Sequence, residues 1–250
     1  MNDDLFSIKD KVCLVTGVSK GLGAHMAQLY LSRGAKVIGI SREEPHWKTD
    51  IYATNFEHFI GDVTDTDVVD KLFLHLSEVY GGVDVVVNNA GASQVQRLKD
   101  TGPDDLQKLF ALNVFAATNV ATQAAAQMRK NNVSGSIINI TSVMAGSSMT
   151  GLAAYSASKA ALSQLTMSMA SEWARSGVRV NNLSPGWFPS AMTEEYFKKG
   201  LGRVLKAKIP MARLGDASDL DGACLLLASD ASRYMTGTTI TIDGGYSLAG

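Results

Sequence analysis

The residues Lys11 to Gly23 read KVCLVTGVSKGLG, and within them a short apolar run gives way to a glycine-rich turn. Residues 11–16 are apolar enough to form a buried strand of a parallel sheet. Residues 24–33 then show helical spacing of their apolar side chains, and Gly34 is placed to end that helix. Because a second apolar run follows at residues 35–40, the order strand, turn, helix, strand predicts a βαβ unit.

The turn of this unit has the composition of a phosphate-binding loop. Its glycines permit a tight turn and let backbone N–H groups approach a pyrophosphate closely, and the N-terminus of the following helix favours the same anion. The spacing, Gly-x-x-x-Gly-x-Gly, differs from the general Gly-x-Gly-x-x-Gly fingerprint, so the position of the turn between strand and helix carries the inference. The expected dinucleotide contacts in the turn are Gly17, Ser19, Lys20, Gly21, Leu22 and Gly23.

The end of the second strand distinguishes between the two nicotinamide cofactors. An acidic residue there would bind the ribose 2′-hydroxyl of NAD, whereas a nearby Arg suits the 2′-phosphate of NADP. Here Ser41 and Arg42 occupy that position, no acidic residue occurs until Glu43, and Lys20 adds a second cation. Because hydroxyl and guanidinium groups both donate hydrogen bonds to phosphate, we expect NADP(H). In the alternative, both cations are solvated surface residues.

The rest of the chain continues to alternate between strands and helices. Further strands are expected at residues 57–63, 83–87, 135–142, 177–183 and 238–243, with helices at residues 65–80, 103–130, about 151–176 and 219–229. A loop with a short helix is expected near residues 44–56, and residues 186–210 read as an amphipathic substrate loop. Because no linker or repeat interrupts the alternation, residues 1–250 predict one doubly wound α/β domain of the Rossmann type, with a seven-stranded parallel sheet flanked by helices.

Polar residues follow several of these strands at their carboxyl ends. Asp62 is placed to meet an adenine amino group or, alternatively, to cap the next helix. Residues 88–91 read Asn-Asn-Ala-Gly, which suits a crevice at the cofactor or a plain turn. Asn113 interrupts an apolar segment of a predicted helix, where it is either a satisfied core amide or the mark of a kink that holds a water.

A tyrosine and a lysine stand four residues apart in a stretch rich in small residues. On a helix, Tyr155 and Lys159 would lie on one face. A lysine ammonium beside a phenol favours the phenolate and lowers the pKa of the tyrosine. A phenol tuned in this way can act as a general acid toward a carbonyl oxygen. The alternative is an ordinary surface Tyr and Lys on an amphipathic helix.

The composition is that of a globular protein without strong charge. Of the 250 residues, 46% are hydrophobic and 19% charged, and the net charge of -1 gives no reason to expect a nucleic acid or a membrane surface as partner. Cys13 and Cys224 each sit in an apolar run, and no Cys or His spacing suggests a metal site. The acidic start of the chain lacks an apolar signal core, so we expect a soluble, cytoplasmic protein.

These motifs together resemble the short-chain dehydrogenase/reductase family, within it the 3-oxoacyl reductase and carbonyl reductase branch. The resemblance extends over residues 11–245 and rests on motifs that follow the order of the family. They are Thr16-Gly17-x-x-x-Gly21-x-Gly23, Asp62, Asn88-Asn89-Ala90-Gly91, Asn113, Ser142, Tyr155-x-x-x-Lys159 and Pro185-Gly186.

The resemblance implies a role for each catalytic residue. Tyr155 would be the acid/base, Lys159 would lower its pKa and hold the nicotinamide ribose, and Ser142 would hydrogen-bond the substrate oxygen. Asn113 would keep a water that links Lys159 to a proton relay. The residues alone indicate Tyr155 and Lys159 but neither of the other two. The cofactor contacts expected outside the glycine-rich turn are Ser41, Arg42, Asp62, Val63, Asn89, Ala90, Gly91, Tyr155, Lys159, Pro185, Gly186 and Ser190.

The run after Pro185-Gly186 departs from the pattern of many relatives, which carry a Thr there. Ser190 or Thr193 could supply the hydroxyl, and the variant resembles 3-oxoacyl reductases associated with rhamnolipid synthesis. Apolar side chains near the expected cleft suit a 3-oxoacyl thioester or an apolar free ketone, unless several of them are core or oligomer contacts. The expected substrate contacts are Ser93, Met144, Leu152, Trp187, Met192 and Tyr196.

The function implied is NADPH-dependent reduction of a ketone to a secondary alcohol by a homotetramer. An alternative of another class is a non-catalytic dinucleotide-binding module that senses redox state. A substrate attached to acyl carrier protein would need basic residues near the cleft, although solvated faces are the default for such residues. The candidates are Arg97, Lys99, Arg129, Lys130, Lys198 and Lys199.

Overall fold

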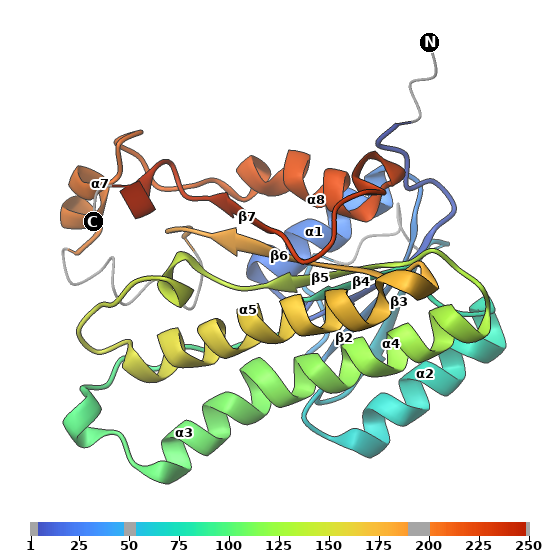
Figure 1. The fold of residues 1–250 in the computed structure, drawn as a ribbon, viewed down its shortest axis with the longest axis horizontal. Helices are drawn as coiled ribbons and strands as arrows, with labels where there is room; N and C mark the ends of the chain where they lie inside the picture. Colours follow the sequence, from blue (N-terminus) through green and yellow to red (C-terminus); the bar gives the residue numbers. More distant parts are fainter. Residues whose placement is uncertain (1–4, 48–53, 190–200, 249–250) are drawn as a thin grey trace.

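A parallel sheet of seven strands runs through the middle of the molecule (Figure 1). The computed structural model describes residues 5–47, 54–189 and 201–248. The strand order is β3-β2-β1-β4-β5-β6-β7, and every neighbouring pair is parallel. The strands are β1 (Val12–Thr16), β2 (Lys36–Ser41), β3 (Phe56–Ile60), β4 (Val85–Asn88), β5 (Ser136–Ile140), β6 (Arg179–Pro185) and β7 (Thr239–Ile242).

The order of the strands creates a crevice at their carboxyl ends. From β1 the chain builds outward to β2 and β3, and from β4 it builds in the opposite direction to β7. The connections that leave β1 and β4 therefore diverge, which opens a space between their carboxyl ends. The seven predicted strands are confirmed, although their ends shift. For example, the sixth begins at Arg179 because Gly177, with φ of 79°, first turns the chain in the left-handed region.

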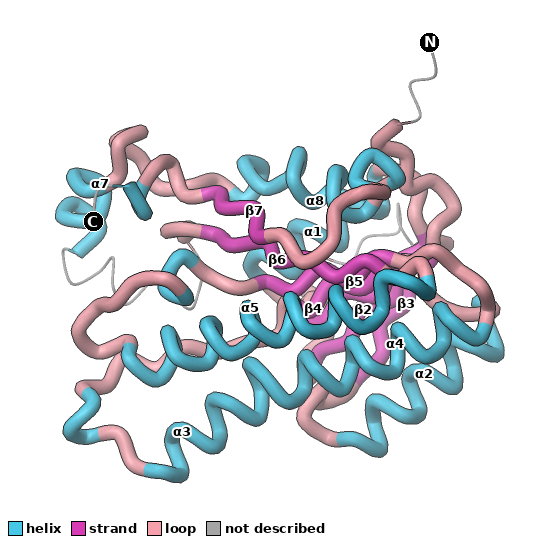
Figure 2. Tube along the Cα trace, viewed as in Figure 1, coloured by secondary structure: helices cyan, strands magenta, loops and turns pink. Residues whose placement is uncertain are grey.

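Helices cover both faces of the sheet (Figures 1 and 2). Helices α1 and α8 lie on one face, over a core cluster that includes Met26, Tyr30 and Leu225. Helices α2, α4 and α5 lie on the other face, over a cluster that includes Leu72, Ile137 and Trp173. The helices are α1 (Gly21–Ser32), α2 (Thr66–Tyr80), α3 (Pro103–Phe110), α4 (Ala117–Lys130), α5 (Ala153–Trp173), α7 (Leu201–Lys208) and α8 (Asp221–Ala228).

The helix predicted at residues 103–130 is not regular. Its halves, α3 and α4, are joined by η3 (Ala111–Ala116), a π-helical segment that contains Asn113. A π-helical turn accommodates one extra residue and is often found at functional sites. The whole run is long and apolar enough to pass as a membrane span, but half of its most apolar window is buried. Since the buried side chains of α4 pack into the cluster under the sheet, it has the character of a core helix.

Buried amides fix α4 and α5 against the sheet. Asn88 Nδ2 donates to Asn139 Oδ1 at 2.9 Å and to the Ala117 carbonyl at 3.0 Å. Asn139 Nδ2 donates in turn to Thr166 Oγ1 at 2.8 Å. Because a buried polar group is expensive to leave without a partner, these bonds restrict how the two helices can slide on the sheet. The position of α5 determines where Tyr155 points.

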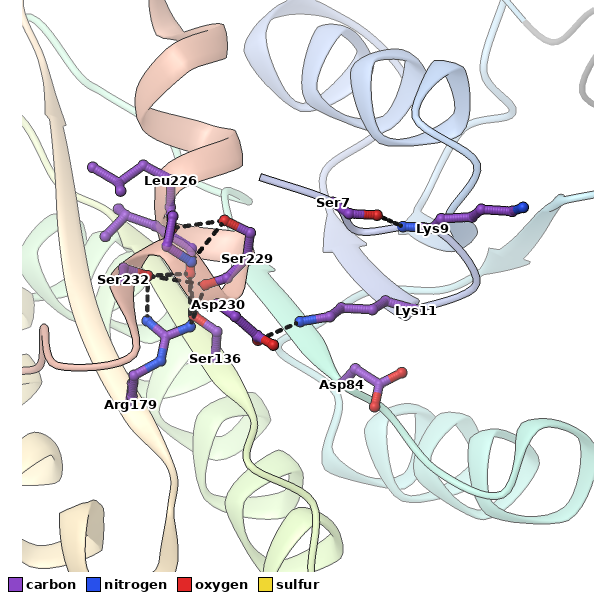
Figure 3. Close-up of polar contacts among 12 residues, drawn as sticks. Ser7, Lys9, Lys11, Asp84, Ser136, Arg179, Leu226, Ser229, Asp230 and Ser232 are labelled. Carbon is purple, nitrogen blue, oxygen red and sulfur yellow. Dashed lines mark hydrogen bonds and ion pairs between the residues drawn. The ribbon is translucent and has the colours of Figure 1, made fainter. Parts of the chain in front are cut away.

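The opposite end of the sheet is held by a second polar network (Figure 3). Arg179, at the start of β6, donates to Ser232 Oγ at 2.7 Å and to the carbonyls of Leu227 and Ser229 at 3.1 and 3.2 Å. Ser136 Oγ donates to the same Leu227 carbonyl at 2.7 Å. These bonds satisfy the carbonyls at the end of α8, which an α-helix leaves without intrahelical partners.

A third, smaller apolar cluster lies beside the carboxyl ends of β5 and β6. Its buried members include Met144, Leu152, Trp187 and Leu205, the last from α7. The rings of Trp187 and Tyr246 meet edge to face, with centroids 5.9 Å apart. Together they join the loops after β5, β6 and β7 into one wall.

Candidate active site

A cavity of about 480 Å³ opens at the carboxyl ends of the strands, in the crevice between β1 and β4. Ligands of open α/β sheets bind at this point of the topology. The lining residues are Gly17, Ser19, Lys20, Gly21, Leu22, Ile40, Ser41, Arg42, Glu43, Gly61, Asp62, Val63, Thr64, Asn89, Ala90, Gly91, Ala92, Lys108, Leu112, Ile140, Thr141, Ser142, Tyr155, Lys159, Pro185, Gly186 and Phe188.

The glycine-rich turn forms one wall of the cavity, as the sequence predicted. Gly17 and Gly21 have φ of +75° and +65°, a region that side-chain-bearing residues rarely adopt. No side chain caps α1 at Lys20, so the N–H groups of its first turn are available for an anion. Gly23 does not line the cavity. A Cβ there would collide with the Gly17 carbonyl and the Asn89 amide, so this glycine allows close packing behind the turn.

The turn is fastened to the neighbouring strand by Thr16 and Asn89. The Thr16 hydroxyl accepts hydrogen bonds from the N–H groups of Asn89 at 3.0 Å and Ala90 at 2.9 Å. Asn89 Nδ2 donates to the carbonyls of Thr16 at 2.9 Å and Gly17 at 3.2 Å. The Asn-Asn-Ala-Gly segment is therefore a structural partner of the turn as well as a wall of the cavity.

The turn has a second support that the sequence did not reveal. Trp47 Nε1 donates to the Val18 carbonyl at 2.7 Å, and its ring lies 4.7 Å from the ring of Phe56. Val18 is fully buried. Trp47 thus supports the middle of the turn through this hydrogen bond to Val18, and we call it the Trp47 strut. A solitary Trp in a predicted loop is a weak signal, because its partner lies 29 residues away along the chain.

The two cations expected at the 2′-phosphate, Arg42 and Lys20, both line the cavity, and each has only a weak partner. Arg42 Nη1 is 3.9 Å from Asp62 Oδ2, and its side chain is 77% exposed. Lys20 Nζ is 3.9 Å from Glu43 Oε2, and its side chain is 65% exposed. Exposed ion pairs of this length contribute little free energy, so an anion could recruit both cations at small cost.

Asp62 lines the cavity and does not cap the next helix. Its Oδ1 accepts from the N–H and the hydroxyl of Thr64, at 2.9 and 2.8 Å. Asp65 is the N-cap of α2 and accepts from the N–H groups of Asp67 and Val68. The capping alternative for Asp62 is therefore wrong, because the helix begins one turn later than that alternative requires.

The candidate catalytic residues Ser142, Tyr155 and Lys159 all line the cavity. Lys159 Nζ lies 6.0 Å from the centroid of the Tyr155 ring and donates to the Ile140 carbonyl at 2.7 Å. The Lys159 side chain is only 5% exposed, and burial lowers its pKa to about 8. Ser142 Oγ accepts from the Met144 N–H at 3.2 Å, which leaves its own proton to donate elsewhere.

Asn113 does not line the cavity but braces its floor from the π-helical segment. Its Oδ1 accepts from the Ala92 N–H, while its Nδ2 donates to the Ala92 carbonyl and to Ser158 Oγ, each at 2.9 Å. Ser158 Oγ donates to the Tyr155 carbonyl at 2.7 Å. The side chain is therefore a satisfied core amide, and it couples η3 to the first turn of α5 that carries Tyr155.

Of the expected substrate contacts that lie within the described residues, none is among the residues that line the cavity. Met144, Leu152 and Trp187 are buried in the third apolar cluster, which also contains Leu205 of α7, and they are not among the residues that line the cavity. Ser93 also lies outside the residues that line the cavity. Some further candidates lie outside the described residues: Ser190, Met192, Thr193, Tyr196, Lys198 and Lys199. Residues that line the cavity but were not predicted to do so include Glu43, Thr64, Lys108, Leu112 and Phe188.

Comparison with known proteins agrees with this geometry. The family model described as enoyl-(acyl carrier protein) reductase matches residues 17–247. A 3-oxoacyl-[acyl-carrier-protein] reductase of Vibrio cholerae is 33% identical over 96% of this chain and 98% of its own length. The chain belongs to the short-chain dehydrogenase/reductase family.

Solved structures of this family share the fold. A short-chain type dehydrogenase/reductase from Mycobacterium marinum superposes with a TM-score of 0.91 at 34% identity, over 97% of this chain and 98% of the other. A gluconate 5-dehydrogenase from Burkholderia cenocepacia, in complex with NADP and tartrate, has a TM-score of 0.90 at 30% identity, over 98% of each chain. The doubly wound sheet is therefore a family feature.

Removing the Trp47 strut should weaken dinucleotide binding without affecting cofactor choice. Trp47→Phe keeps a ring against Phe56 but cannot donate a hydrogen bond to the Val18 carbonyl. The ordered conformation of the turn should therefore lose about 1 kcal/mol of stabilising free energy. We expect NADPH and NADH to bind about five-fold more weakly, measured by isothermal titration calorimetry. Trp173→Phe, on α5, is the matched control and should leave both affinities unchanged. A loss confined to one dinucleotide would contradict the role of Trp47.

Burial of the Lys159 ammonium should make the protein less stable at neutral pH. The pKa of Lys159 is about 8 in the folded protein and has its ordinary value of 10.5 in the unfolded chain. Between these two pH values the unfolded state therefore binds more protons than the folded state. Wild-type stability should rise as pH increases through this window, by about 3 kcal/mol. Lys159→Met lacks this dependence. We expect it to be the more stable protein at pH 7, with an advantage that shrinks toward pH 10 in urea unfolding without cofactor. If the free energies of unfolding of the wild type and Lys159→Met differ by the same amount at every pH, the destabilisation by a buried Lys159 charge is refuted.

Proposed function

We propose that this chain is an NADP(H)-dependent oxidoreductase that reduces a ketone to a secondary alcohol, with Tyr155 as the general acid. The observation that carries the proposal is one cavity lined by two chemically distinct groups of residues. Ser142, Tyr155 and Lys159 form one group, and the residues of the glycine-rich turn form the other. A proton donor and a dinucleotide-binding turn in one cavity are what reduction by hydride transfer requires.

The residues of the chain supply everything in this reaction except the hydride. When bound, the reduced nicotinamide supplies that hydride to the carbonyl carbon. Ser142 and Tyr155 hydrogen-bond the carbonyl oxygen, and Tyr155 donates its proton as negative charge develops there. Lys159 supplies positive charge 6.0 Å from the phenol ring, which favours the phenolate that remains.

Pre-organisation of the proton donor follows from its supports. The first turn of α5 is held through Ser158 and Asn113, and Lys159 is fixed by the Ile140 carbonyl. Gly91 lets the backbone lie close to these groups, because a Cβ there would be only 3.2 Å from Asn113 Oδ1 and 3.5 Å from Lys159 Nζ. Gly91 also lines the cavity, where a residue without a side chain would let a nicotinamide ribose approach the backbone closely.

The preference for NADP(H) rests on the rim formed by Ser41, Arg42 and Lys20. These are two cations and a hydroxyl, which together suit a phosphate dianion. The nearby carboxylates of Glu43 and Asp62 hold the cations only loosely, at 3.9 Å each. The Burkholderia cenocepacia relative, solved with NADP, supports the same assignment.

The substrate class follows from the apolar surroundings of Tyr155. Tyr155 packs against the third apolar cluster, together with Met149, Leu214 and Tyr246. This surface favours an apolar ketone or a 3-oxoacyl thioester over a polyhydroxy acid such as gluconate, because it offers few hydrogen-bond partners. The Vibrio cholerae relative, a 3-oxoacyl-[acyl-carrier-protein] reductase, supports the thioester form of the substrate.

The basic residues considered for acyl carrier protein separate into two groups. Arg97 and Lys99 are exposed beside a segment that bonds to Gly151, just before α5, through the Gln96 N–H at 2.9 Å. Arg129 and Lys130 lie at the end of α4, where Asn131 bonds to Gly81 at the far end of the molecule. Of the four candidates that lie within the described residues, only Arg97 and Lys99 follow a segment that contacts the residues just before α5.

The assembly and location proposed are a homotetramer in the cytoplasm. Phe115 and Met167 are exposed apolar residues on the helical layer formed by η3 and α5, and a second copy could cover them. Among the described residues no group of three His, Cys, Asp or Glu could hold a metal ion. Neither a metal nor a nucleic acid enters the proposal.

Replacement of the phenol tests the reaction itself. Tyr155→Phe keeps the ring but removes the proton donor, so turnover should fall by about 10²–10⁴ while NADPH affinity stays within two-fold. The measurement is NADPH oxidation with a panel of a 3-oxoacyl thioester, a β-keto ester, an aryl ketone and a cyclic diketone. An unchanged rate would sink the mechanism. Tight NADPH binding without turnover of any ketone by the wild type would favour the redox-sensing alternative.

Removal of the Arg42 guanidinium tests the cofactor assignment. Arg42→Ala should lose a charge-assisted contact with the 2′-phosphate, which weakens NADPH binding by roughly 1.5–3 kcal/mol and leaves NADH little changed. Titration of both cofactors by quenching of tryptophan fluorescence would measure this difference. Arg175→Ala, in the turn after α5, is a control for the loss of surface charge. An equal loss for the two cofactors would overturn the 2′-phosphate role.

A further inference from the structure

We propose that His58 is a positioning residue for the 2′-phosphate of the cofactor and acts through the hydroxyl of Ser41. Neither the comparisons nor the motifs of the chain point to this histidine. The inference rests on the NADP(H) preference proposed above. It predicts that His58 contributes to the discrimination between NADP and NAD without touching either one.

The pairing of β2 with β3 brings the two side chains together. His58 on β3 lies in register with Gly39 on β2, two residues before Ser41. Residues two apart on a strand share a face of the sheet, so Ser41 lies on the same face as Gly39 and His58. Because Gly39 has no side chain, none stands between Ser41 and His58 at that position. His58 Nε2 consequently reaches Ser41 Oγ at 2.8 Å.

A count of protons gives the direction of this bond. Ser41 Oγ also lies 2.8 Å from the Glu43 carbonyl, which can only accept. The single hydroxyl proton of Ser41 is therefore given to Glu43, and the bond to His58 must use a proton on Nε2. The chain of donors runs from His58 through Ser41 to the backbone of Glu43.

This arrangement prepares Ser41 to donate toward a phosphate. Phosphate oxygens only accept hydrogen bonds, so a 2′-phosphate at this rim takes the Ser41 proton in place of the Glu43 carbonyl. His58 remains a donor to the same oxygen throughout, which holds the hydroxyl in place and strengthens it as a donor. A ribose 2′-hydroxyl brings its own proton and can donate to Ser41 instead. Binding of a ribose 2′-hydroxyl therefore depends less on His58 than binding of a 2′-phosphate does.

Burial distinguishes Ser41 from the other groups of this rim. Ser41 is 8% exposed, whereas the side chains of Arg42 and Lys20 are 77% and 65% exposed. The two cations must lose rotamer freedom to bind a phosphate, but Ser41 is already ordered by its partners. The fixed donor of the rim is Ser41, and His58 is part of what fixes it.

The test is binding of nucleotide fragments, which needs no turnover. Adenosine 2′,5′-bisphosphate carries the 2′-phosphate and adenosine 5′-monophosphate lacks it, and both would be titrated calorimetrically into the full chain. His58→Leu removes the donor and should weaken the bisphosphate about five-fold, with less than a two-fold effect on the monophosphate. His75→Leu, on α2, makes the same chemical change where Nε2 faces Glu57, and it should leave both affinities unchanged.

Two polar variants keep the test sharp if the Leu variant folds poorly. His58→Gln can place an amide N–H near the position of Nε2 and should retain the wild-type preference. His58→Asn is shorter and should lose it, although it is equally polar. In a Ser41→Ala background, a change of His58 should have no further effect on the bisphosphate, because the effect passes through that hydroxyl.

The outcomes separate this inference from the proposed reaction. An equal loss of both fragments, or an Asn variant that matches the Gln variant, would overturn the role of His58. A wild type without preference for the bisphosphate would overturn it together with the NADP(H) assignment. If no ketone is reduced and the predicted fragment pattern is found, the reaction fails and the role of His58 stands.

Discussion

The hydrogen bonds between Thr16 and Asn89 are the constraint on which the site depends. They join β1 and β4 at the point where the chain departs in opposite directions, so they hold the crevice at a fixed width. The glycine-rich turn leaves from one side of this junction and the Asn-Asn-Ala-Gly segment from the other. Two walls of the cavity consequently share one set of bonds, and Trp47 braces the turn from behind.

The catalytic residues are held in a different way, by a buried charge that is surrounded by hydrogen-bonded polar groups. Lys159 is enclosed, and burial lowers its pKa, yet the Ile140 carbonyl holds its ammonium in place. Asn113 and Ser158 tie the first turn of α5 to the segment after β4. A buried charge disfavours the folded state while it serves the chemistry, which is the usual tension between stability and activity at such sites. The large clusters on both faces of the sheet supply the stability that offsets it.

Much of the fold could be predicted because its signals are local. Seven apolar runs separated by helical spacing predict a parallel α/β sheet, and the predicted strands were all found. The helical stretch at residues 103–130 was predicted as one element in which Asn113 was either a core amide or the mark of a kink, and no pattern in the sequence indicated that the irregularity is a π-helical segment. The substrate contacts remain predictions. Met144, Leu152 and Trp187 are apolar in the right region, but only packing decides whether an apolar side chain faces a ligand or the core.

The sequence by itself determined the alternation of strands and helices, the glycine-rich turn and the four-residue step from Tyr155 to Lys159. Each is a property of neighbouring residues, because helix and strand periodicity and glycine conformation act over a few positions. Only the tertiary structure decided that Trp47 supports Val18, that Asn113 reaches Ala92 and Ser158, and that His58 bonds to Ser41. These contacts join residues 17 to 45 positions apart, and strand pairing and helix packing, which no local pattern encodes, bring them together.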